Sequence, residues 1–114
     1  MSVIVWHNPK CSKSRQALAL LEERGLTPTV RKYLSDPPSA AEIRAVLKKM
    51  GTDDPHALVR KREKRYAELS VAEMSGSDVV IAMADNPKLI ERPVVITDKG
   101  ARIGRPTELI LEVL

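Results

Sequence analysis

The sequence predicts an α/β fold in which a helical insertion separates the two halves of a mixed four-stranded β-sheet. Three observations support this prediction. The first 33 residues follow a strand–helix–strand pattern, residues 37–90 are mostly helical in pattern, and the last quarter predicts a β-hairpin followed by a helix. With 114 residues, 43% hydrophobic and 30% charged, the chain is long enough for one globular domain.

The first strand–helix–strand segment is defined by its apolar spacing. Residues 2–6 form a short, mainly β-branched run that is typical of a strand. Apolar residues recur at helical spacing after Ser14, and Gly25 marks the end of that helix. Residues 29–33 predict a second strand. Because two strands joined by a helix normally lie parallel, with a right-handed crossover, we expect that pairing here.

The insertion has clear helix boundaries. Ser39 and Glu42 have the spacing of a capping box, and the helix that they start is predicted to stop at Gly51. Two further helices are predicted over residues 55–60 and 77–85.

The last part of the chain returns to the sheet. Residues 94–97 and 101–103 predict two strands joined by a turn at residues 98–100, and residues 107–114 predict a final helix. The complete order β-α-β, helical insertion, β-β-α is that of a thioredoxin-like domain. We therefore expect residues 1–114 to form a single domain of this type, with an unrelated α/β sandwich as the alternative.

Composition narrows the classes of ligand. The net charge of +4 suits an anion, but three aromatic residues are too few for the stacking that single-stranded nucleic-acid binders use, so we expect no nucleic-acid partner. One cysteine and two histidines cannot supply a zinc site, and we expect no metal. No apolar run approaches the ~20 residues that span a bilayer, so we expect no membrane association.

Cysteine usage and the start of the chain favour the cytoplasm. A single cysteine cannot form an internal disulfide, so an oxidising compartment would not stabilise this fold. No basic segment followed by a long apolar stretch opens the chain, and no secretory signal is expected. The sequence has no coiled-coil heptads, and we expect a monomer.

Cys11 is the candidate reactive residue. It follows the first strand and a turn, and it opens the first predicted helix. A thiol at a helix N-terminus faces unpaired backbone N–H groups and the positive end of the helix dipole, which favour the thiolate. Lys10, Lys13 and Arg15 add positive charge nearby. The alternative is that Cys11 is a small buried hydrophobic residue without chemistry.

Two arginines, Arg92 and Arg105, flank the predicted hairpin, and each is followed by proline. A tight turn about residues 98–99 places them opposite each other at one end of the sheet. Two guanidinium groups held together repel unless an anion lies between them, and their planar forks match tetrahedral oxyanions. The alternative is that each arginine pairs with a neighbouring carboxylate, Glu91 or Glu108.

Other polar residues have two open interpretations each. Arg60 ends a short predicted helix and can simply interact with its dipole, and residues 61–65 are expected to be a solvated basic face. His7 can orient or activate the cysteine, or it can be a satisfied residue at a strand end. Asn8 and Ser14 can form hydrogen bonds near the sulfur, or they can be ordinary turn and cap residues. We take as supporting residues Asn8, Ser14 and Arg15.

Several motifs together resemble one family. Residues 7–15, H-N-P-K-C-S-K-S-R, resemble the active-site segment of the glutaredoxin-coupled arsenate reductases, the ArsC family. The resemblance continues through residues 33–38, 57–61 (A-L-V-R-K), 91–95 (E-R-P-V-V) and 104–106 (G-R-P), so it covers essentially the whole chain. Because the chain ends directly after the last predicted helix, it is most similar to the short chromosomal members.

The resemblance implies a thioredoxin-like fold with a helical insertion, and it implies roles for matching residues. Cys11 is then the nucleophile, His7 assists its thiolate, and Pro93 is the cis-proline beside it. The implied oxyanion site consists of Arg60, Arg92 and Arg105. In the implied reaction the thiolate attacks arsenate, glutathione adds to the arsenic as a co-substrate, and glutaredoxin reduces the adduct to release arsenite. No tightly bound cofactor is implied.

The sequence also keeps alternative functions open. Some relatives of this fold are transcription regulators with a C-x-x-C redox switch, but the fourth position of that motif is Ser14 here. A single-cysteine enzyme must complete its cycle with an external thiol. The alternatives are a glutathione-linked thiol–disulfide oxidoreductase that does not act on arsenate, and a redox-linked regulatory or binding protein of the same fold.

Overall fold

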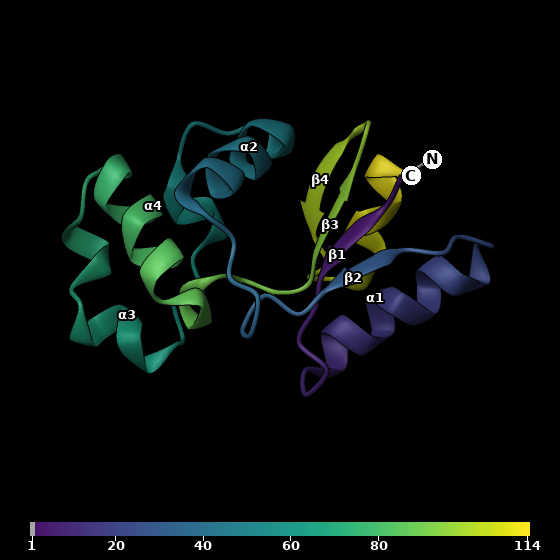
Figure 1. Cartoon of the computed structure of the whole chain (residues 1–114), viewed down its shortest axis with the longest axis horizontal. Coiled ribbons are helices and arrows are strands. Elements are labelled where there is room, and N and C mark those ends of the chain that lie inside the picture. The colour runs from purple at the N-terminus through teal and green to yellow at the C-terminus, as the bar shows by residue number, and fades with distance from the viewer. Residues whose placement is uncertain (1) are drawn as a thin grey trace. The chain divides into compact units, whose positions relative to one another are not determined.

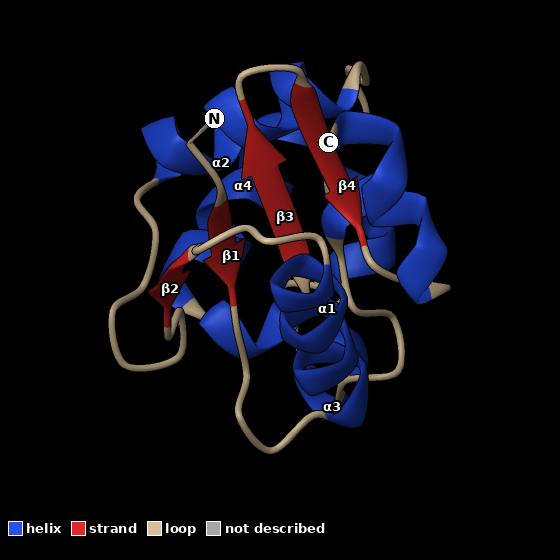
Figure 2. Ribbon diagram, turned by 90° about the vertical axis from the view of Figure 1, so that its right-hand side faces the viewer, coloured by secondary structure: helices blue, strands red, loops and turns tan. Residues whose placement is uncertain are grey.

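The computed structural model describes residues 2–114 and contains the predicted four-stranded mixed sheet (Figure 1). Its strands are β1 (Ile4–Trp6), β2 (Thr29–Arg31), β3 (Val94–Thr97) and β4 (Gly100–Ile103), arranged in the order β2-β1-β3-β4 (Figure 2). β1 pairs parallel with β2, as predicted for the strand–helix–strand segment, and antiparallel with β3. β3 and β4 form an antiparallel hairpin.

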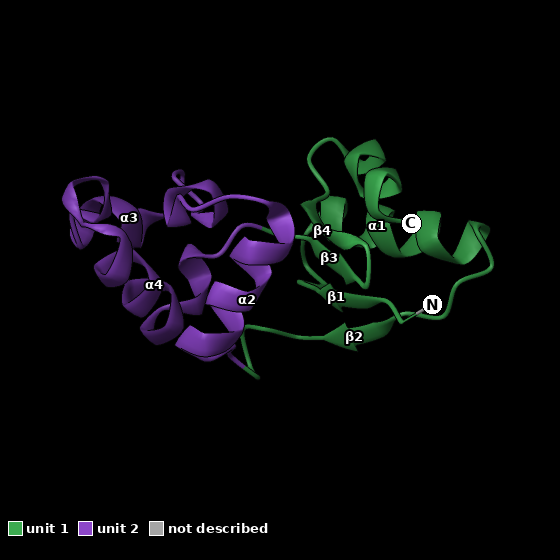
Figure 3. Cartoon of the chain, turned by 90° about the horizontal axis from the view of Figure 1, so that it is seen from above, with its two compact units in different colours: residues 1–36, 92–114 green, residues 37–91 purple. Residues whose placement is uncertain are grey.

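The chain forms two compact units, which Figure 3 distinguishes. Unit 1 comprises residues 1–36 and 92–114, and unit 2 comprises Pro37–Glu91. Unit 1 therefore contains the whole sheet, and its two sequence segments are joined through unit 2.

In unit 1, two helices pack on one face of the sheet. They are α1 (Ser12–Glu23) and the 3₁₀ helix η4 (Thr107–Val113). The alternating side chains of a strand point to opposite faces, so the cross-strand pair Val5 and Val95 shares the buried face. The core cluster of buried residues contains Val3, Val5, Ala17, Leu21, Val95, Ile110 and Val113. This packing brings the start of α1 and the segment before η4 to one side of the sheet.

The predicted end of α1 is confirmed. Gly25 has a φ of +74°, a left-handed conformation that favours glycine, and its N–H donates to Glu22 O at 2.9 Å. The last segment is helical as predicted, but it is a 3₁₀ helix.

Unit 2 is helical, with α2 (Ala40–Met50), α3 (Lys64–Glu68) and α4 (Gly76–Asp85) as its α-helices. Its 3₁₀ helices are η1 (Pro55–Leu58), η2 (Val71–Glu73) and η3 (Pro87–Leu89). The predicted capping box is present: Ser39 Oγ accepts from Glu42 N at 3.1 Å, and Glu42 Oε1 accepts from Ser39 N at 3.0 Å. Gly51 ends α2 with a φ of +79°.

Two predicted boundaries in unit 2 are wrong. The helix expected over residues 55–60 stops at Leu58, because Val59 is extended and forms a β-bridge with Ile90. The helix expected from residue 77 begins at Gly76, because Ser75 occupies the N-cap position. Within residues 2–114, no helix is both long and apolar enough to cross a lipid bilayer.

Candidate active site

The loop between β1 and α1 holds Cys11 at the N-cap of the helix. Cys11 N–H donates to Asn8 O at 2.9 Å, and the Asn8 side chain accepts from Lys10 N at 3.0 Å. The Arg15 guanidinium reaches back from α1 and donates to Pro9 O at 2.9 Å. These local bonds fold the loop over the first turn of the helix, so Asn8 and Arg15 both shape the segment that carries the sulfur.

Cys11 is partly exposed, and hydrogen-bond donors lie near its sulfur. Burial raises the pKa of the thiol, but the backbone amides of Ser14 and Lys13, the Ser14 hydroxyl and the charge of Arg92 lower it. The net pKa lies below the usual value of a thiol. The thiolate, the nucleophilic form, is therefore favoured.

Arg105 contacts the sulfur directly. Its Nη2 donates to Cys11 Sγ at 3.3 Å, although 94 positions separate the two residues in sequence. Its Nε donates to Arg92 O at 2.7 Å, so the guanidinium is held at two points. Among the described residues, Arg105 forms no ion pair with a carboxylate. The alternative partner that the sequence suggested for it, Glu108, is therefore not used.

The hairpin register brings the two Arg-Pro segments together. The ladder runs from Thr97 opposite Gly100 to Val94 opposite Ile103, and Gly104 N–H continues it by donating to Pro93 O at 2.9 Å. The hydrogen bond from Arg105 to Arg92 O follows at the same end of the sheet. The expected juxtaposition of the two segments is thus present.

Close packing at this end requires a glycine. The Arg92–Pro93 peptide bond is cis, as the resemblance implied, and so is the Arg105–Pro106 bond. A Cβ added at Gly104 would lie 2.9 Å from Pro93 Cγ and 3.2 Å from Ile110 Cγ2. Gly104 therefore allows the strand that leads to Arg105 to lie directly against Pro93.

His7 lies at the end of β1, and its side chain is buried, with the residue 5% exposed. Its backbone N–H donates to Arg31 O at 2.8 Å, whereas its Nδ1 has no hydrogen-bond partner among residues 2–114. Burial, followed by the charges of Lys32 and Arg15, lowers the pKa of His7 and so favours the neutral imidazole. Assistance of the thiolate by His7 stays a prediction.

Arg60 belongs to unit 2. Its backbone N–H donates to Leu89 O at 2.6 Å, beside the bridge between Val59 and Ile90. Its guanidinium Nη1 lies 3.4 Å from Glu63 Oε2. This ion pair is partly buried. The role of Arg60 in an oxyanion site stays a prediction.

The sequence model of the ArsC family matches residues 6–113 of this chain. The chain belongs to the ArsC family. The match spans the cysteine loop, the helical unit and both Arg-Pro segments, so every residue that the motifs singled out lies within it.

Individual proteins match this chain along nearly their full length. The "Uncharacterized protein YfgD" of Escherichia coli strain K12 is 47% identical, with 98% of this chain and 96% of the relative covered. The arsenate reductase of Haemophilus influenzae is 42% identical over 100% of both chains. The solved structure of the arsenate reductase of Vibrio cholerae is 46% identical, with a TM-score of 0.96 and with 100% of this chain and 98% of that chain covered. The thioredoxin-like fold class is thereby confirmed.

One contact near the site joins two residues that were not among the predicted site residues. Thr107 Oγ1 donates to Gln16 Oε1 at 3.1 Å, which joins the start of η4 to α1 across 91 positions. Both side chains are ordinary polar residues in helical patterns, so no signal in the sequence marks them as partners.

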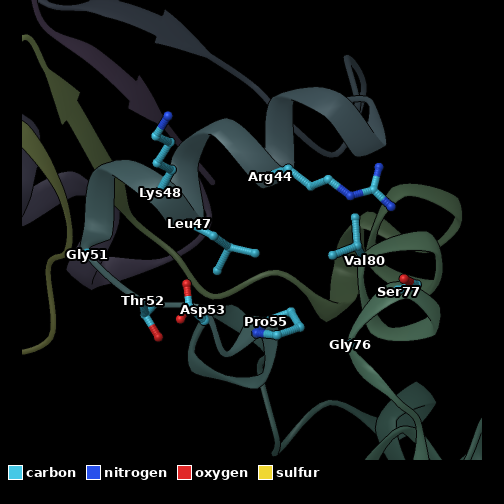
Figure 4. Close-up of a pocket in the computed structure, with 10 residues that line it drawn as sticks. All are labelled: Arg44, Leu47, Lys48, Gly51, Thr52, Asp53, Pro55, Gly76, Ser77 and Val80. Carbon is cyan, nitrogen blue, oxygen red and sulfur yellow. The ribbon is translucent and has the colours of Figure 1, made fainter.

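Unit 2 of this ArsC family member has a cavity of its own, of about 650 Å³ (Figure 4). It lies between α2, the turn after it and the start of α4, and it contains none of the predicted site residues. Its charged side chains, Arg44, Lys48 and Asp53, are exposed. Among residues 2–114, no group of three or more His, Cys, Asp or Glu residues could hold a metal ion.

Proposed function

We propose that this protein reduces arsenate to arsenite, with Cys11 as the nucleophile. The observation that supports this most directly is the 3.3 Å hydrogen bond from Arg105 Nη2 to Cys11 Sγ. It pairs a guanidinium, a good ligand for oxyanions, with a thiol whose pKa lies below its usual value. The names of the relatives from Haemophilus influenzae and Vibrio cholerae support the same substrate.

In the first step the Cys11 thiolate attacks arsenic. An S–As bond forms, an As–O bond breaks, the oxygen leaves as hydroxide or water, and arsenic stays pentavalent. Because the thiolate and arsenate are both anions, fixed cations must offset their repulsion before they can meet. We assign this role to Arg60, Arg92 and Arg105, with His7 assisting the thiolate as a neutral group.

The electrons come from two external thiols, because Cys11 is the only cysteine of the chain. Glutathione adds to the arsenic adduct through a second S–As bond and displaces another oxygen. A glutaredoxin thiolate then attacks the glutathione sulfur, so one mixed disulfide forms and arsenic takes the electron pair to become trivalent. Hydrolysis of the remaining S–As bond releases arsenite and restores Cys11. We place this cycle in the cytoplasm, where thiols are kept reduced, and assign it to a monomer.

A coupled assay tests this function. NADPH consumption is followed with glutathione, glutaredoxin and glutathione reductase, with and without arsenate, for the wild type and Cys11→Ser. We expect a rate that needs arsenate and both thiol donors, and its loss in Cys11→Ser. A rate that does not depend on arsenate would instead support a thiol–disulfide oxidoreductase. A biological activity that survives Cys11→Ser would support a non-catalytic binding protein.

A second experiment tests the arginine assignments. Arg92→Ala and Arg105→Ala should each weaken arsenate or sulfate binding by roughly tenfold or more, since a hydrogen bond to a charged group contributes about 1.5–3 kcal/mol. Lys64→Ala removes one exposed positive charge in unit 2 and serves as the control. Calorimetric titration measures all three. Equal losses in the three variants would mean that only the overall charge matters.

A further inference from the structure

The position of Arg105 depends on a short, unusual stretch of chain. The residue follows Gly104, where the backbone lies against Pro93, and it precedes Pro106, which has no N–H to donate. The next residue, Thr107, begins η4. Whatever holds Thr107 in place therefore also limits how far the backbone of Arg105 can move relative to α1.

The hydrogen bond between Thr107 and Gln16 provides such a restraint. Thr107 Oγ1 donates to Gln16 Oε1 at 3.1 Å, and Gln16 lies in the second turn of the helix whose N-cap is Cys11. The other end of η4 is fastened separately, because Thr97 Oγ1 donates to Val113 O at 2.6 Å. Apolar packing also connects the two helices, but among residues 2–114 the bond to Gln16 is the only hydrogen bond between α1 and η4.

We propose that Gln16 and Thr107 are positioning residues that hold the Arg105 segment against α1. In this arrangement the Arg105 guanidinium stays within hydrogen-bonding distance of Cys11 Sγ. This inference rests on the proposed function for its importance, since Arg105 is a proposed oxyanion ligand. Its geometry, however, exists in the protein without any substrate.

The pKa of the Cys11 thiol shows whether Arg105 remains in this position. The groups that face the sulfur are the amides of Lys13 and Ser14 and the Ser14 hydroxyl from α1, and Arg92 and Arg105 from the segments that flank the hairpin. The loss of the contact between Gln16 and Thr107 leaves the donors of α1 in place and loosens only Arg105. The thiolate then loses one charged hydrogen bond, so the pKa of Cys11 should rise.

The test measures the rate of alkylation of Cys11 by iodoacetamide against pH, without arsenate. Thr107→Val and Gln16→Met keep the side-chain volume and remove the hydrogen bond. Each should raise the apparent pKa and slow alkylation about threefold at a pH below it. Thr107→Ser keeps the hydroxyl and should behave as the wild type. The double variant should match the single variants, because both remove the same contact.

The matched control is Glu112→Met. It removes another exposed side-chain bond of η4, the one from Arg102 Nε to Glu112 Oε1 at 2.9 Å, which joins η4 to β4 and not to α1. We expect it to leave the thiol pKa unchanged. The inference is overturned if Thr107→Val and Gln16→Met both keep the wild-type profile, or if Glu112→Met shifts it equally. Because no arsenate is present, this result is independent of whether the protein reduces arsenate.

Discussion

At the scale of single residues, the lowered pKa of Cys11 results from opposing effects on one sulfur. Burial raises the thiol pKa, and the amides of Ser14 and Lys13, the Ser14 hydroxyl and the Arg92 charge more than offset it. Arg105 adds a direct hydrogen bond while its Nε remains bound to Arg92 O. In the proposed function, the same guanidinium stabilises the thiolate before an oxyanion enters and contacts the oxyanion afterwards.

The lowered pKa of His7 predicts how the free energy of unfolding depends on pH. Burial first, and then the charges of Lys32 and Arg15, lower the pKa of His7 in the folded protein, so the unfolded chain binds this proton more tightly. Its stabilising contribution should be fully present above the usual histidine pKa of 6.5 and should be lost as the pH falls from there towards the lowered pKa. Urea unfolding between about pH 8 and about pH 5 measures this loss.

Histidine variants separate this effect from general acid denaturation. His7→Gln removes the titrating group, so the free energy of unfolding should fall less over the same pH range than in the wild type. His56→Gln makes the same substitution at the other histidine, in unit 2, and serves as the matched control for the loss of a histidine side chain. An unchanged pH dependence in His7→Gln would contradict the assignment of this effect to His7.

At the scale of elements, the hairpin β3–β4 and the two Arg-Pro segments that flank it form one packed unit. Its register sets Arg92 and Arg105 at one end, and Gly104 allows the close approach to Pro93. Gly104→Ala would place a Cβ 2.9 Å from Pro93 Cγ. We expect a loss of about 1–3 kcal/mol in the free energy of unfolding, because the packed neighbours must shift. Urea unfolding measures it.

A second glycine provides the control for Gly104→Ala. A Cβ at Gly76 would meet its nearest neighbour, Pro55 Cγ, at an ordinary 3.6 Å, and Gly76 lies at the start of α4. Gly76→Ala should therefore be neutral or slightly stabilising, because alanine lowers the entropy of the unfolded chain. If Gly104→Ala is as stable as Gly76→Ala, the close approach to Pro93 does not constrain the hairpin.

At the scale of the whole molecule, the sheet unit is discontinuous in sequence. Its two segments are joined through unit 2, which has 55 residues if counted from Pro37 to Glu91. A unit of this size is marginally stable alone, and its unfolding would turn the connection within unit 1 into a long loop with an entropic cost. We therefore propose that the chain behaves as a single domain that unfolds in one transition.

Two probes test the single transition. Fluorescence of Trp6, which is buried in unit 1, should change at the same urea concentration as far-UV circular dichroism, to which the α-helices of unit 2 contribute. Ile43→Val changes a buried residue of α2. It should lower the free energy of unfolding by about 0.5–1.5 kcal/mol and shift both midpoints together. Two separate midpoints, or a shift in only one of them, would contradict a single domain.

The element order could be predicted because its signals are local. The capping box of Ser39 and Glu42, the glycines that end α1 and α2, and the alternation of the hairpin each depend on a few neighbouring residues. Inside unit 2, local sequence patterns were weaker guides to the helix boundaries. The β-bridge between Val59 and Ile90 shortens the expected helix, and it joins residues that are distant in sequence. α3 and η2 were not predicted, because they are short and carry no distinct apolar pattern.

The sequence by itself determined that Cys11 lies at the start of a helix, since a cysteine after a strand and a turn opens that helix wherever the helix packs. It also determined that Arg92 and Arg105 flank one hairpin, since the register follows from the turn. Only the tertiary structure decided that Arg105 reaches the sulfur, that His7 is buried with a lowered pKa, and that Thr107 contacts Gln16. These facts depend on packing between segments up to 94 positions apart, which no local pattern records.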